Sequence, residues 1–134
     1  MVIRPKKTLS AAYEFIKEWK AETPGPYHYL EVKCFGMSYQ KVFIDPAFDH
    51  IERRRQRIKA DPKNIARRYR LLPCVKDLLM NSEDTPEPTR DGNLFLVGKA
   101  PPYNELFRVI LSSFPVTLAP GLEGYNLISF FPLT

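Results

Sequence analysis

Two Asp-Pro pairs constrain the fold of this chain more than any other feature of its sequence. In Asp45-Pro46 and Asp61-Pro62, a residue that caps helices precedes a residue that lacks a backbone N–H. Aspartate is a preferred N-cap residue, and proline is favoured at the first helical position and disfavoured within a central strand. The pairs therefore predict the end of a strand and the start of two helices, at residues 45–59 and 61–72.

Apolar spacing predicts the elements that precede these helices. Between residues 8 and 21 apolar residues recur at three- and four-residue intervals, which is typical of an amphipathic helix. Residues 27–35 and 39–44 are rich in aromatic and β-branched residues and predict two strands. Residues 1–7 are expected to form a loose basic lead.

The last third of the chain is predicted to form a β-meander, with strands at residues 94–99, 105–112 and 125–131. In the middle strand Arg108 and Ile110 fall on one face and Val109 on the other. Residues 81–93 contain proline and glycine but no large apolar residue, and are expected to form a mobile surface loop. The chain of 134 residues is thus predicted to be one α+β domain, with N-terminal helices packed on an antiparallel sheet.

Several protein classes are not supported by the sequence. No stretch approaches the roughly 20 apolar residues of a membrane span, and the first residues lack the apolar core of a secretory signal. We therefore expect a cytoplasmic protein, with export by another route left open. Cys34 and Cys74 lie in apolar surroundings outside any CxxC pattern and are expected to be buried thiols. Phosphate-loop, dinucleotide-binding and zinc-protease motifs are missing, so no cofactor and no metal are expected.

Positive charge is concentrated in residues 50–70. This segment holds nine basic residues opposed only by Glu52 and Asp61, so it carries +7 while the rest of the chain carries about −2. Seven of the nine are arginine, which binds phosphate through two parallel hydrogen bonds. The segment therefore indicates a polyanionic partner such as RNA, although a solvated helix face balanced by carboxylates elsewhere would have the same composition. The predicted RNA-binding residues are Arg53, Arg54, Arg57, Arg67 and Arg68.

Four residues are candidates for chemistry on such a partner: His50, Lys99, Arg108 and Ser129. His50 begins the basic segment, and a histidine transfers protons near neutral pH. Taken singly, each candidate also has an ordinary explanation as a surface or strand residue. His28, within an aromatic strand, is expected to be a packed residue.

Parts of the chain resemble phage-type members of the barnase–EndoU–colicin–RelE nuclease superfamily. The resemblance spans roughly residues 27–132 and rests on short motifs: VFID at 42–45, DHIERR at 49–54, the stretch 94–99, LFRVIL at 106–111 and NLISFFP at 126–132. In that family helices precede an antiparallel sheet, and the last strand carries a small hydroxyl residue before an aromatic residue and a proline.

The resemblance implies a ribonuclease that needs no metal, such as a toxin or a phage-encoded effector. In such enzymes the 2′-hydroxyl attacks the adjacent phosphate and forms a cyclic phosphate. By position His50 would be the base or acid, Arg54 and Arg108 would hold the phosphate, Ser129 would hydrogen-bond it, and Lys99 is a weaker candidate. The family often has a second histidine soon after the first, whereas residues 54–56 here are Arg, Arg and Gln. A RelE-like scheme, with arginine and lysine in place of histidine, therefore stays open.

Two other functions fit the same residues. The chain can be a nucleic-acid-binding module without catalysis, which needs only the basic segment. It can also be a protein-interaction domain, such as an inhibitor or adaptor, whose arginine-rich helix docks on an acidic partner. For the ribonuclease, an inhibitor or antitoxin protein is an expected second partner besides RNA.

Overall fold

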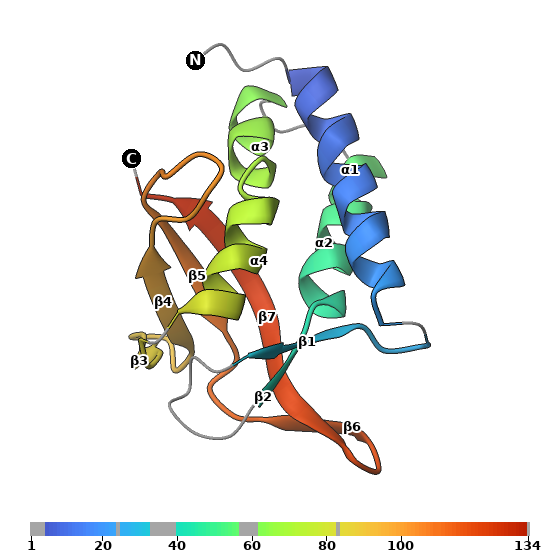
Figure 1. Ribbon diagram of the computed structural model, residues 1–134, viewed down its shortest axis with the longest axis vertical. Helices are drawn as coiled ribbons and strands as arrows, with labels where there is room; N and C mark the ends of the chain where they lie inside the picture. Colours follow the sequence, from blue (N-terminus) through green and yellow to red (C-terminus); the bar gives the residue numbers. More distant parts are fainter. Residues whose placement is uncertain (1–4, 24, 33–39, 57–61, 83, 134) are drawn as a thin grey trace.

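The computed structural model describes residues 5–23, 25–32, 40–56, 62–82 and 84–133. Within these ranges the predicted α+β class is confirmed (Figure 1). In chain order the elements are α1 (Pro5–Ala21), β1 (Tyr29–Val32), β2 (Gln40–Phe43), α2 (Asp45–Gln56), α3 (Pro62–Tyr69), α4 (Leu72–Asn81), β3 (Glu87–Pro88), β4 (Leu94–Gly98), β5 (Phe107–Leu111), β6 (Val116–Ala119) and β7 (Leu122–Pro132).

The strands form one sheet in the order β1-β2-β7-β5-β4-β3, with β6 paired to β7 beside this path. Every pairing is antiparallel except that of β2 with β7, which is parallel. A parallel pair needs a long crossover, and the whole stretch from α2 to β6 supplies it here. The sheet was predicted to be antiparallel, and it is so except for the parallel pair of β2 with β7.

The helices gather on one side of β4, β5 and β7 (Figure 1). Between the two layers lies a core that includes Trp19, whose ring contacts Phe48 edge-on at 5.1 Å between centroids. On β5 the buried residues alternate as predicted: Phe107, Val109 and Leu111 are buried, while Arg108 and Ile110 lie on the other face. We call that other side of β4, β5 and β7 the outer face, and its residues are Phe95, Val97, Arg108, Ile110, Ser129 and Phe131.

Two helices differ from their predicted bounds. α1 begins at Pro5, so residues 5–7, expected in a loose lead, form its first turn. Proline at the first helical position fits this start. α4 extends for ten residues from Leu72, where the last predicted helix was expected to end. Its buried residues Leu72, Val75 and Leu79 recur at helical spacing, which explains the longer element.

Two β segments also differ from the prediction. The expected loop at residues 81–93 contains β3, which pairs with the start of β4, and Asn93 donates its backbone N–H to Thr89 Oγ1 at 3.0 Å. β6 was not predicted, because its four residues lie between Pro115 and Pro120 and carry no clear alternation. None of the helices in the described ranges is both long enough and apolar enough to cross a membrane.

Candidate functional site

Arg68 and Ser129, predicted separately as an RNA-binding and a catalytic residue, are in direct contact. The Arg68 guanidinium on α3 donates Nη2–H to Ser129 Oγ and Nε–H to the Phe130 carbonyl oxygen, the latter at 2.6 Å. Nothing in the local sequence indicates this pair, because α3 and β7 are far apart in the chain. The contact exists because α3 packs against β7.

The Phe130 carbonyl lies at an open edge of β7. Leu133 N–H donates to Leu106 O at 3.1 Å, so in this antiparallel pair every second residue of β7 is bonded to β5. Phe130 falls between those positions, and its carbonyl therefore points away from β5. On that side β2 pairs only as far as Asn126. Arg68 thus satisfies a carbonyl that no strand reaches, and covers an edge that would otherwise be open.

Arg108 lies beside Ser129 on the outer face. Arg108 is opposite Phe131 on β7, and Ser129 is opposite Ile110 on β5, so Arg108 and Ser129 are diagonal neighbours. Such neighbours are roughly 7–8 Å apart. The Arg108 guanidinium stacks on the Phe95 ring at 4.3 Å from its centroid. Its Nε is buried and makes no hydrogen bond within the described part of the chain.

Glu105 binds the other arginines at the end of α3. Its carboxylate forms an ion pair with Arg67 at 3.5 Å and a second ion pair with Arg70. The guanidinium of Arg70 also lies 4.8 Å from the Tyr103 ring centroid. Arg67 and Arg68 were predicted to face RNA directly, whereas both already bond acceptors of the protein. A phosphate reaches them only in competition with these bonds.

The other predicted site residues do not contact Ser129 in any interaction that the described part of the chain shows. His50 and Arg53 are exposed on α2, which packs against β7 through its other side. Lys99 is exposed just after β4, four positions beyond Phe95, which lies across β5 from Ser129. At about 3.3 Å per residue, four positions separate Lys99 from Ser129 by about 13 Å along the strands. The side chain of Arg54 and the whole of Arg57 lie outside the described residues.

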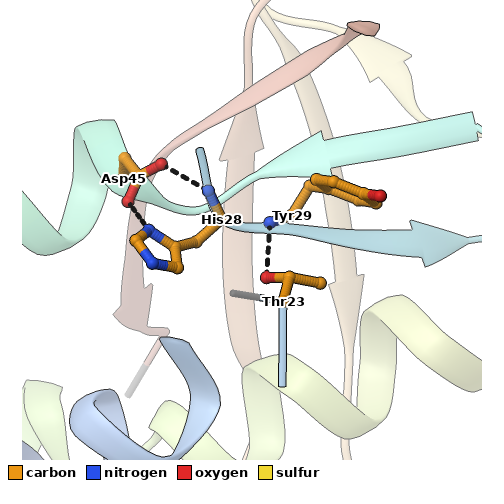
Figure 2. A network of polar contacts seen from close by, with 4 residues as sticks. All are labelled: Thr23, His28, Tyr29 and Asp45. Carbon is orange, nitrogen blue, oxygen red and sulfur yellow. Dashed lines mark hydrogen bonds and ion pairs between the residues drawn. The ribbon is translucent and has the colours of Figure 1, made fainter. Parts of the chain in front are cut away.

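A second polar centre, which the sequence did not indicate, joins His28 to Asp45 (Figure 2). Asp45 Oδ1 lies 2.7 Å from His28 Nδ1, and Asp45 Oδ2 accepts the His28 backbone N–H at 2.7 Å. Both side chains are about one fifth exposed, at 20% and 21%. A carboxylate that holds Nδ1 fixes the ring and directs Nε2 to proton exchange.

This pair changes two predictions. Asp45 was expected to cap α2, but both of its carboxylate oxygens contact His28, and the Phe48 N–H at the helix start donates to Ile44 O at 3.1 Å. His28 was expected to be a packed residue, and it is partly buried and bonded to a carboxylate. The pair ties the start of β1 to the start of α2, which is a structural role in its own right.

Cys74 is a buried free thiol, as predicted. Burial raises the pKa of the Cys74 thiol, and hydrogen bonding to the Tyr103 backbone only partly opposes this. The predicted burial of Cys34 concerns a residue outside the described part. Among the described residues, no group of three or more His, Cys, Asp or Glu side chains is arranged to hold a metal ion.

No protein-family model, curated protein or solved structure matches this chain. The candidate site therefore rests on its geometry: a guanidinium group on α3, a second on β5 and a hydroxyl on β7. An exposed histidine lies on α2, which also packs against β7.

Proposed function

We propose that this protein is a ribonuclease that cleaves RNA by transphosphorylation without a metal ion, in the manner of a toxin or phage effector. The observation that supports it most is the contact of Arg68 with Ser129, beside Arg108 on the outer face. Arg68 was selected from the sequence for its place in the basic segment, and Arg108 and Ser129 for their places on the C-terminal strands. Together they would offer one phosphate two cations and a hydroxyl donor.

The proposed chemistry places negative charge where these groups lie. The 2′-oxygen bonds to phosphorus, the bond to the 5′-oxygen breaks, and a 2′,3′-cyclic phosphate results. Charge develops on the phosphoryl oxygens in the transition state, and pre-positioned donors stabilise it. Arg108 is the phosphate-binding residue, Ser129 donates its hydroxyl hydrogen, and Arg68 positions Ser129 and adds positive charge.

Proton transfer is assigned to His50 as base or acid. His50 is exposed on the helix that packs against β7, next to Arg53 and Arg54 of the basic segment. His28 is the competing candidate, because Asp45 holds its Nδ1. Lys99 has the weakest claim, since it lies about 13 Å from Ser129 along the strands.

The test is cleavage of a single-stranded RNA by the pure chain in EDTA, with mass spectrometry of the products. We expect 2′,3′-cyclic phosphate ends. Ser129→Ala and Arg108→Gln should each lower the rate by about a hundredfold. The matched controls, Ser113→Ala after β5 and Arg90→Gln in the exposed turn after β3, should retain it. Comparison of His50→Gln with His28→Gln identifies the proton-transfer residue, and no cleavage by the folded wild-type chain would reject the enzyme.

A second function, RNA binding without cleavage, is favoured by the outer face itself. No helix of the described ranges covers it, and it presents two aromatic rings beside Arg108, from Phe95 and Phe131. Aromatic and guanidinium groups on an uncovered sheet stack unpaired bases. This function predicts salt-dependent binding that weakens in Arg108→Gln, with intact RNA recovered.

Location and protein partners follow from the same proposal. A ribonuclease of this kind acts in the cytoplasm and is paired with an inhibitor or antitoxin protein. Its arginine-rich helix would then meet an acidic surface of that partner, which a pulldown with the Ser129→Ala variant would detect.

A further inference from the structure

A pocket of about 370 Å³ lies between the start of α1, the junction of α3 with α4, and the turn at residues 101–103. It is separate from the Arg68–Ser129 contact, because Arg68 points to β7 while Tyr69 and Arg70 line the pocket. Its volume is within the range of small-molecule sites. The residues that define its chemistry are Lys7, Phe15, Tyr69, Arg70 and Tyr103.

The pocket carries excess positive charge. Lys7 and Arg70 line it, and Arg67 shares with Arg70 the single carboxylate of Glu105. Two cations therefore line the pocket, and the residues that line it in the described part of the chain include no Asp or Glu. Glu105 holds Arg70 in a fixed orientation and reduces its attraction for an anion. Lys7 is exposed and is the cation best placed to meet a ligand phosphate.

Aromatic side chains form a large part of the remaining lining. Tyr103 is 37% exposed, and the Arg70 guanidinium lies over its ring at 4.8 Å from the centroid. Phe15 and Tyr69 also line the pocket, together with the smaller apolar residues Ala11, Ala12 and Pro73. Aromatic rings and guanidinium planes are the groups on which proteins stack unpaired bases. A nucleotide fits this lining, because its planar base can stack on the aromatic rings and its phosphate can bind the cations.

We propose that this pocket binds one nucleotide of single-stranded RNA, with its base against Tyr103 and its phosphate at Lys7. The proposal rests on the proposed function, since it takes RNA to be the ligand. The pocket would receive a nucleotide other than the one bound at Ser129, because Arg68 points to β7 while Arg70 lines the pocket. It would thereby favour single-stranded over paired RNA, because a paired base must first break its pairing and stacking in order to enter.

Titration of the full-length chain with AMP, CMP, GMP and UMP, followed by NMR, tests this pocket. We expect chemical-shift changes at Tyr103 and its neighbours, and weaker changes with adenosine or inorganic phosphate alone. Tyr103→Leu and Lys7→Gln should each weaken nucleotide binding about tenfold. Lys17→Gln, on the exposed side of the same helix, is the matched control and should bind as the wild type does.

The two proposals fail in different ways. If no mononucleotide perturbs the pocket, or if Tyr103→Leu and Lys7→Gln bind normally while folded by circular dichroism, the pocket proposal is overturned. RNA cleavage that depends on Ser129 would survive that result. If nucleotides bind at Tyr103 but RNA stays intact, the pocket proposal is supported and the ribonuclease proposal is rejected. Equal shifts with an aromatic carboxylate such as benzoate would reject nucleotide selectivity.

Discussion

Arg68 on α3 hydrogen-bonds Ser129 on β7 across 61 residues of sequence, and the same guanidinium binds the Phe130 carbonyl. One side chain therefore closes the open edge of β7 and fixes the hydroxyl that we assign to phosphate binding. Under the proposed function, stability and activity would be coupled at this point, so that variants of Arg68 would report on both.

Arg68→Gln should destabilise the fold, because it leaves the Phe130 carbonyl without its donor at a partly buried edge. We expect a loss of about 1–3 kcal/mol in the free energy of unfolding. Arg53→Gln removes an exposed arginine from the same basic segment and should change it by less than about 0.5 kcal/mol. Urea unfolding measures both values. Equal changes in the free energy of unfolding for the two substitutions would show that the contact of Arg68 with the Phe130 carbonyl does not stabilise the fold.

Gly124→Ala should disrupt the parallel pairing of β2 with β7. A Cβ at Gly124 would overlap the backbone carbonyl of Lys41, which is rigid and part of the sheet. We expect a loss of about 1–3 kcal/mol, as for other overpacked sites. Gly98→Ala is the matched control, because its Cβ would lie 2.7 Å from the Leu78 Cδ1, the far end of a flexible side chain. Thermal unfolding that ranks the two variants in the opposite order would contradict this account.

Asp45→Ala should loosen the junction between β1 and α2. It removes the acceptor of the His28 backbone N–H and the partner of the His28 ring, both at 2.7 Å. We expect a loss of about 1–3 kcal/mol in stability. Asp49→Ala, one turn further along the same helix and exposed, should have little effect. Hydrogen exchange of the His28 amide provides a local check, since it should accelerate only in Asp45→Ala.

Cys74 should make the fold less stable in alkali. Burial raises the pKa of this thiol, so above the ordinary thiol pKa of about 8.5 the unfolded chain loses a proton that the folded chain keeps. The contribution of the Cys74 thiol to the free energy of unfolding is therefore fully present below that pH and declines as the pH rises. In a Cys34→Ala background, Cys74→Ala should show a shallower decline between about pH 8 and pH 10 than its parent. Parallel declines would argue against the raised pKa.

The elements that the sequence predicted depend on local signals. α2 starts at Asp45 and α3 at Pro62, as the two Asp-Pro pairs indicated. On β5, Arg108 lies on the face opposite Val109, as the alternation of residue types predicted. Proline geometry and residue alternation act over a few neighbouring residues, so their effects can be predicted from a single sequence.

Tertiary structure decided how those elements meet. The parallel pairing of β2 with β7, the Arg68 bond to Ser129 and the His28 pair with Asp45 each join separate segments. The charge of the basic segment predicted that Arg67 and Arg68 face a ligand. In the fold, Arg67 forms an ion pair with Glu105, and Arg68 hydrogen-bonds the Phe130 carbonyl on β7. A guanidinium binds whichever acceptor the fold brings within reach, and residue order along the chain does not specify that acceptor.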